Sequence, residues 1–253
     1  MLVQRRGKGR LRLVEQHEHG LISGELARVW AVGAEGDGLP DTVVLATALH
    51  DLGWRALDAR PKLDPDTGLP HDFMTFPLAE KYRAAAEGID RVAELHPYAG
   101  VLVSLHYSEL GKENAPVEFL EHEEERRFEL LDLLGEEAPS GGRLRGDLAH
   151  LQLLDHLSLF LCLASPEAEE GTVPRWLSGE AFRPVEGYGA LRARWTDPET
   201  VQVTPYPFRV DPLAVDVPVR DVAGAPFASQ AELDAALAQA EDDTQVVELT
   251  SGA

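Results

Sequence analysis

Cysteine is almost absent from this chain. Its 253 residues include one, Cys162, in the apolar run LSLFLCLA. A lone cysteine excludes a metal site built from thiolates. In these surroundings we expect a buried, reduced thiol that packs as a small hydrophobe rather than a nucleophile.

Basic residues are also scarce. Lys and Arg total 23 against 44 Asp and Glu, which gives a formal net charge of -21. Such a surface repels nucleic acid and anionic lipid, so neither is an expected partner. A small phosphate-bearing ligand would meet the same repulsion unless its site supplied local positive charge, from a metal ion or from a few Arg and Lys side chains.

Long apolar runs are missing as well. No segment approaches the roughly 20 residues needed to span a bilayer, and the basic start MLVQRRGKGRLRLV lacks an apolar stretch of signal-peptide length. We therefore expect a cytoplasmic protein without a membrane partner. The pattern leaves its oligomeric state open.

Several catalytic motifs are absent. The chain has no GxSxG elbow, no GxxxxGK[ST] phosphate loop, no GxGxxG after a strand and no HExxH motif. Their absence removes the main enzymatic alternatives to a metal site built from scattered His and Asp residues.

Hydrophobic periodicity predicts a largely helical chain. LVQRR and RLRLV around Gly7-Lys8-Gly9 indicate a β-hairpin, and a helical period starts at Gln16 and stops at GAEGDG. Further helices are predicted at TVVLATALHDLG, closed by Gly53, at 78–94, 97–110 and 116–135, and, after the PSGG break, at LAHLQLLDHLSLFLCLA. Residues 58–77 are rich in Pro, Asp and Gly, which predicts a functional or lid-like loop, with a plain surface excursion as the alternative.

The pattern changes from about Tyr188. RARW, TVQVTPYPF, AVDVPVR and TQVVELT alternate as strands do, and ASQAELDAALAQAEDD is typical of an exposed helix. The predicted fold is mainly α, a helical bundle with a small antiparallel β-rich part from the C-terminal region and the N-terminal hairpin. Its predicted parts are 1–15, 16–165 and 166–253.

One aspartate stands inside the most apolar helix. Asp155 shares a stripe with Leu148, Leu151, Leu159 and Cys162, so we expect it to be buried. A buried carboxylate costs several kcal/mol unless it is protonated, hydrogen-bonded, ion-paired or bound to metal.

Two other places offer ligands. His50-Asp51 ends the second helix after VVLATAL, where the aspartate faces the negative end of the helix dipole, and a cation would reverse that balance. In the first helix His19 shares the apolar stripe, whereas His17 lies on a mixed face. An exposed HD dipeptide and a satisfied core histidine are the structural alternatives. Two imidazoles and two carboxylates suit iron, manganese, zinc, magnesium or nickel.

The motifs EQHEHGLISGELA, ALHDLGW and LLDHLSLFLC resemble, in their order His, His-Asp, Asp, the HD-domain metal-dependent phosphohydrolases over residues 16–165. QHEHGLISGELARVW, LVSLHYSEL and TPYPF are similar, more narrowly, to a bacterial HD-like family of unknown function. The resemblance implies an HD-like bundle in which four residues take the metal-ligand positions: His19, His50, Asp51 and Asp155.

Further residues follow from the same comparison. Some HD enzymes place extra histidines before the last aspartate, so His106, which shares a stripe with Tyr98 and Leu102, or His96 is expected to hold a second metal or a substrate phosphate; His96 is equally a helix cap. Independently of the resemblance, the Pro-rich loop predicts that His71 and Asp72 close over a substrate or carry a proton, with plain solvated loop residues as the alternative, and Lys81 is a basic candidate for contact with the substrate.

The resemblance implies hydrolysis of a phosphomonoester or phosphodiester by a water that the divalent metal activates. The alternatives are a non-catalytic module that senses a small ligand through the same metal pocket, and a structural bundle without metal. The sequence specifies no substrate.

Overall fold

The computed structural model describes residues 1–31, 38–179, 182–185 and 187–252. The first helix ends at Val29. Its predicted stop signal, the glycine-rich stretch at 33–38, lies outside the described residues except for Gly38.

The helices were largely predictable from their period. Those before the last strands are α1 (Gln16–Val29), α2 (Asp41–Leu49), η1 (Leu52–Trp54), α3 (Arg55–Asp58), α4 (Leu78–Leu95), α5 (Pro97–Leu110), α6 (Val117–Leu134), η2 (Gly135–Glu137), α7 (Gly141–Leu163) and η3 (Arg175–Leu177). Helix α8 (Gln230–Gln239) follows near the end of the chain. Ser229 caps it by accepting a hydrogen bond from the backbone N–H of Glu232.

The start of α7 differs from its prediction. The helix begins at Gly141, well before the apolar run, because Ser140 accepts a hydrogen bond from the backbone N–H of Arg143 and so caps it. Pro139 and Ser140 thus form the predicted break, and the two glycines that follow already belong to α7. Two consecutive glycines hid this, since glycine is a poor helix former.

Six of the described strands form one sheet. They are β1 (Leu2–Arg5), β2 (Arg10–Val14), β5 (Arg192–Trp195), β6 (Thr200–Thr204), β7 (Leu213–Ala223) and β8 (Asp242–Thr250), in the order β1-β2-β7-β8-β6-β5. The N-terminal hairpin thus joins the C-terminal strands, as predicted.

The prediction of a purely antiparallel sheet is wrong. Strands β6 and β7 run in opposite directions, and β8 returns between them antiparallel to β7, so it runs parallel to β6. Alternation along a strand reports which face is buried but says nothing about the direction of its neighbour.

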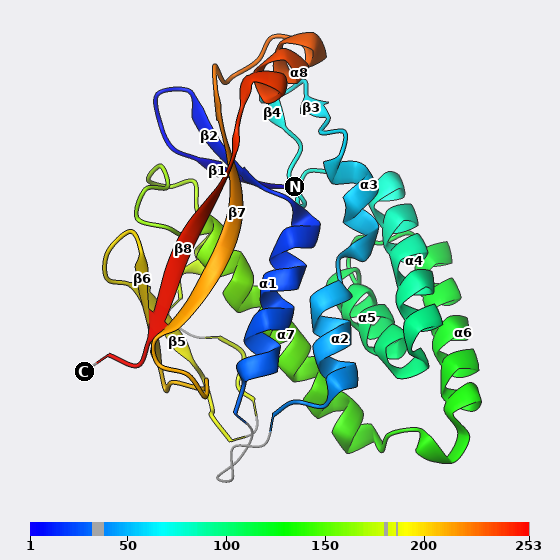
Figure 1. The fold of residues 1–253 in the computed structure, drawn as a ribbon. Helices are drawn as coiled ribbons and strands as arrows, with labels where there is room; N and C mark the ends of the chain where they lie inside the picture. Colours follow the sequence, from blue (N-terminus) through cyan, green and yellow to red (C-terminus); the bar gives the residue numbers. More distant parts are fainter. Residues whose placement is uncertain (32–37, 180–181, 186, 253) are drawn as a thin grey trace.

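The fold class also needs correction, from mainly α to mixed α/β. In Figure 1 the sheet lies along one side, α1 and α7 are next to it, and α4, α5 and α6 lie on the far side of these helices. One hydrophobic core runs through these layers, from Val215 and Leu2 of the sheet to Leu26 of α1 and Leu154 of α7. The division at residues 15 and 165 stays a prediction.

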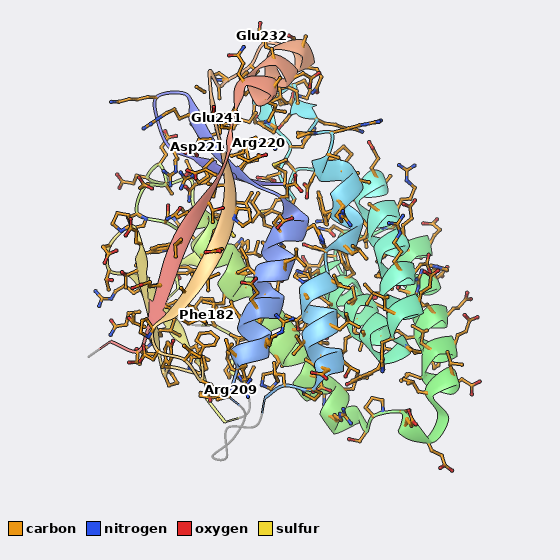
Figure 2. All side chains as sticks on the ribbon, viewed as in Figure 1. Phe182, Arg209, Arg220, Asp221, Glu232 and Glu241 are labelled. Atoms are coloured by element: carbon orange, nitrogen blue, oxygen red, sulfur yellow. The ribbon has the colours of Figure 1, made fainter. Side chains whose placement is uncertain are left out.

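Charge pairs link neighbouring strands near one end of β7. Arg12 of β2 donates two hydrogen bonds of 2.7 Å to Asp221 of β7, and Arg220 of β7 pairs with Asp242 of β8. Figure 2 shows Arg220 and Asp221 at the end of β7 that the hairpin approaches. Partial exposure screens such pairs, so they fix register more than they add stability.

The segment predicted as a long loop is partly ordered by its own ladder. Strands β3 (Leu63–Asp64) and β4 (Leu69–Pro70) pair around a turn in which Gly68 has a φ of 69°. Within the described part of the chain, none of the helices is both long and apolar enough to cross a membrane.

Candidate metal centre

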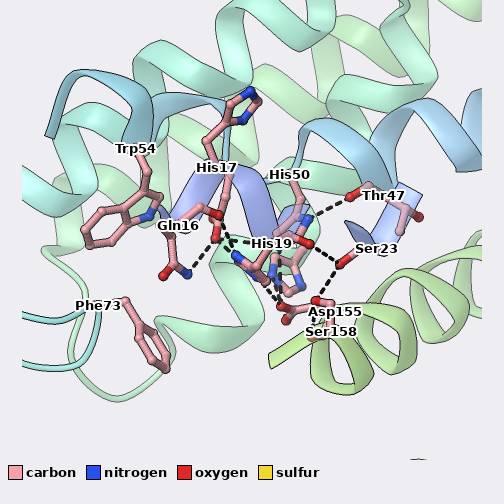
Figure 3. A network of polar contacts seen from close by, with 12 residues as sticks. Gln16, His17, His19, Ser23, Thr47, His50, Trp54, Phe73, Asp155 and Ser158 are labelled. Carbon is pink, nitrogen blue, oxygen red and sulfur yellow. Dashed lines mark hydrogen bonds and ion pairs between the residues drawn. The ribbon is translucent and has the colours of Figure 1, made fainter. Parts of the chain in front are cut away.

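Four side chains from three places in the chain meet between the helices. His19 comes from α1, His50 caps the end of α2, Asp51 follows it, and Asp155 lies in the middle of α7. Figure 3 shows the two imidazoles beside Asp155 in the network of polar contacts. His19 has no exposed surface and Asp155 is 9% exposed, which confirms the predicted burial of this aspartate.

The imidazole nitrogens and carboxylate oxygens face one another at short range. His19 Nε2 lies 3.1 Å from Asp155 Oδ1 and 3.7 Å from Asp51 Oδ2. His50 Nε2 lies 3.4 Å from Asp155 Oδ1 and 3.6 Å from Asp51 Oδ2. Each imidazole therefore bridges the two carboxylates.

Backbone hydrogen bonds fix the two rings. The Nδ1 of His50 donates to the carbonyl of Thr47 at 2.8 Å, and the Nδ1 of His19 donates to the carbonyl of Gln16. With Nδ1 protonated, the Nε2 of a neutral ring carries only a lone pair and faces an anionic oxygen. That arrangement is repulsive unless a proton or a metal cation lies between them, and it is the way metal-binding histidines are held.

A hydrogen-bond chain orients Asp51. Its Oδ2 accepts a hydrogen bond of 2.7 Å from Gln16 Nε2, and its Oδ1 accepts one from the hydroxyl of Tyr107. The hydroxyl of Tyr107 in turn accepts a hydrogen bond of 3.1 Å from Trp54 Nε1. Sequence reasoning missed these three donors, although Tyr107 directly follows His106 and Trp54 follows Asp51 by three positions.

The electrostatics follow from burial and from the opposed charges. Burial acts to raise the pKa of Asp155, but the close contacts with His19 and His50 outweigh it and hold that pKa well below its ordinary value. Burial acts to lower the pKa of His50, but the charges of Asp51 and Asp155 prevail and raise it to about 9. Without a cation, His50 is thus the group that carries the compensating proton.

His106 of α5 belongs to the same cluster. Its Nε2 lies 3.6 Å from Asp155 Oδ2, and burial lowers its pKa to about 4, so the ring is neutral. Among the residues that the structure describes, two sets have ligand atoms close enough to hold a metal ion: His19, His50 and Asp51, and His50, His106 and Asp155.

Other predicted residues lie elsewhere. His96 caps α5 by accepting a hydrogen bond from the N–H of Tyr98. Asp72 accepts hydrogen bonds from the N–H groups of the turn that follows it, and His71 contacts Thr75 in the same turn. Neither His71 nor Asp72 lines the cavity that adjoins the cluster, so their role in binding or catalysis stays a prediction.

His17 is more buried than its position on a mixed helix face suggested. It is buried too, and burial lowers its pKa to about 4. Figure 3 shows its ring pointing away from His19 and Asp155. The choice of His19 over His17 as the residue of the cluster therefore agrees with the geometry.

A cavity of about 440 Å³ adjoins the cluster. Asp51, His106 and Asp155 form one wall, and the side chains of Trp54, Phe73 and Trp176 form others. Lys81 of α4 lines the cavity as well, unlike His71 and Asp72. Burial lowers the pKa of this lysine, against the charges of Asp51 and Asp72.

The fold and site define a mixed α/β protein with buried His and Asp groups that are compatible with a metal ion. The chain belongs to the family described as "Protein of unknown function (DUF3891)", which matches residues 1–224. No curated protein and no solved structure matches the chain.

Proposed function

We propose that His19, His50, Asp51 and Asp155 bind a divalent cation, with His106 available to a second ion or to a substrate phosphate. The donor set of imidazole nitrogens and carboxylate oxygens suits manganese, iron, nickel, zinc or magnesium. The most direct support is that the Nε2 atoms of His19 and His50 face carboxylate oxygens while their Nδ1 atoms donate to backbone carbonyls, since a cation can replace the proton that such a contact otherwise needs.

We further propose that the protein is a metal-dependent phosphohydrolase acting on a small phosphomonoester or phosphodiester. A bound divalent ion supplies two things in such a site: it activates water and it polarises a phosphoryl oxygen. The order His, His-Asp, Asp, which resembles that of the HD-domain phosphohydrolases, supports hydrolysis, and the adjoining cavity supports access for a substrate.

The chain's own residues have distinct tasks in this scheme. Asp51 and Asp155 supply the negative charge that holds the cation, and Tyr107 and Gln16 fix the orientation of Asp51. The ammonium group of Lys81 gives the cavity a positive charge for a phosphate, which a chain with a net charge of -21 needs.

The experiment is a panel of phosphomonoesters and phosphodiesters with manganese, nickel, magnesium or zinc added to chelator-treated protein. Hydrolysis should depend on the added ion and vanish in Asp51→Asn, which keeps the size of the side chain but removes a charge. Activity that survives chelation and this substitution would contradict the proposal, because it would come from another site or a contaminant.

A non-catalytic metal module is the second candidate. The complete burial of His19 favours it, since an ion enclosed in this way can join helices without meeting a substrate. Metal-loaded protein that is more heat-stable but hydrolyses no ester of the panel would support this reading.

A further inference from the structure

The cavity beside the cluster has apolar walls. Trp54, Phe73, Leu159, Leu110 and Trp176 line it, while the ligand cluster occupies one wall. The rings of Phe73 and Trp176 meet edge to face, with centroids 6.4 Å apart. Its volume of about 440 Å³ lies within the roughly 300–1,000 Å³ typical of small-molecule sites.

Two of these apolar side chains remain largely uncovered. Leu110 is 61% exposed and Trp176 is 47% exposed, yet both belong to the cavity lining. Exposed apolar groups that are contiguous with a cavity are typical of a surface that a ligand covers. An apolar ligand group placed there would remove their surface from water.

Three polar residues of the lining, Glu109, Gln152 and Arg183, contact one another. Gln152 donates a hydrogen bond of 2.9 Å to Glu109, and Arg183 contacts both Gln152 and Glu109. The apolar side chains Phe73, Leu110 and Leu159 offer no hydrogen-bond partners, so hydroxyl groups of a ligand placed against them would lose their hydrogen bonds to water. The lining therefore disfavours a sugar-like ligand.

Lys81 is the exception among the charged groups. Its Nζ donates a hydrogen bond of 3.0 Å to the carbonyl of Phe73, and across the described part of the chain it forms no ion pair with a carboxylate. Its charge is thus free to meet an anion in the cavity that Asp51 and Asp155 also line, and the charge of Asp51 acts on it there.

We infer that the ligand of this cavity is an aryl phosphate, whose phosphate lies between Lys81 and the metal cluster and whose ring packs against Phe73, Leu110 and Trp176. This inference rests on the proposed function for the presence of a phosphate. It adds that the organic part is apolar and that Trp176 and Leu110 determine specificity.

Calorimetry with two phosphonates, in which a carbon–phosphorus bond replaces the hydrolysable ester bond, tests it. Benzylphosphonate and methylphosphonate carry the same anion and differ by one phenyl ring, so metal-loaded protein should bind benzylphosphonate about tenfold more tightly or better. Trp176→Ala should remove most of that preference while metal content stays unchanged. The substitution keeps the backbone carbonyl of Trp176, to which the ring of His156 is hydrogen-bonded at 2.9 Å.

Leu110→Asn should reduce the preference in the same way, and Phe128→Ala is the control, because Phe128 is an exposed aromatic residue of α6 outside the cavity lining. Equal affinity for the two phosphonates, or tighter binding of ribose 5-phosphate than of benzylphosphonate, would overturn the inference. A clear preference for benzylphosphonate without hydrolysis of any aryl phosphate would leave the inference standing and contradict the proposed function instead.

Discussion

His19 Nε2 and Asp155 Oδ1 lie 3.1 Å apart although 136 residues separate them in the chain. The contact joins α1 to α7 inside the core and places an imidazole nitrogen against a carboxylate oxygen. Ser23 and Ser158, one turn further along the same two helices, are linked by a hydrogen bond of 2.8 Å that holds the helices at this spacing. The pair is thus built into the packing of the two helices.

His19→Ala should abolish stoichiometric metal binding, because it removes a ligand that no neighbouring side chain can replace. Elemental analysis of the purified variant measures this directly. His17→Ala is the matched control, since His17 is a buried histidine of the same helix whose ring points away. Loss of metal in the His17 variant and retention in the His19 variant would contradict the assignment.

Metal affinity should rise with pH between about 7 and 9. The pKa of His50 in the metal-free protein is raised to about 9, above its ordinary value, so a cation must displace one proton below that pH. The apparent affinity should gain about tenfold per pH unit and level off above pH 9. Calorimetry in buffers of different ionisation enthalpy should detect about one released proton.

The raised pKa of His50 also makes the stability of the metal-free protein depend on pH. Because the folded pKa of His50 exceeds its unfolded value, its contribution to stability is complete below pH 6.5 and is lost as the pH rises through about 9. The melting temperature of chelator-treated protein should therefore fall across this pH interval, and that of metal-loaded protein should not. If the melting temperatures of the two forms depended on pH in the same way, His50 would be excluded as the titrating group.

Tyr107→Phe should weaken metal binding by about 10- to 100-fold, the usual effect of removing a group that orients a ligand. The substitution deletes only the hydroxyl that donates to Asp51. Tyr82→Phe is the control, because its hydroxyl donates to Asn114 instead. Equal metal affinities for the two variants, measured by competition with a chromophoric chelator, would show that the contact with Asp51 has no influence on the ion.

Gly24→Ala should disturb the spacing of α1 and α2. A Cβ at Gly24 would lie 2.4 Å from the Cβ of Ala48, so the helices would have to separate, at a cost of about 1–3 kcal/mol in the free energy of unfolding. Gly146→Ala is the control, since a Cβ there meets nothing within 4 Å and should stabilise α7 by about 0.5–1 kcal/mol. Urea denaturation distinguishes the two, and equal stability would contradict the close packing.

The helices and the buried aspartate could be predicted from the sequence because their signals are local. An apolar stripe of 3.6-residue period contains its own phase, and a carboxylate inside it must be buried. Gly53 illustrates the limit: it was predicted as a helix stop, but its φ is not positive, and a Cβ there would lie 2.0 Å from the carbonyl oxygen of Ala84 in α4. Close packing between distant segments leaves no local pattern.

The sheet and the outer part of the site share that limit. The direction of β8 relative to β6 depends on where β8 inserts, and the extent of the sheet depends on joining both ends of the chain. Tyr107, Trp54 and Trp176 are aromatic residues whose sequence positions are equally compatible with plain core or surface, so only their contacts with Asp51 and the cavity reveal them.

Metal content, measured by elemental analysis on protein purified without chelator from metal-supplemented medium, tests the central claim most directly when the wild type and Asp155→Asn are compared side by side. The cluster predicts about one or two divalent ions per wild-type chain and a loss of most of them in the variant, because Asp155 contacts His19, His50 and His106 at once. Wild-type protein that contains no divalent metal and releases no heat on titration with manganese, nickel or zinc would contradict the claim.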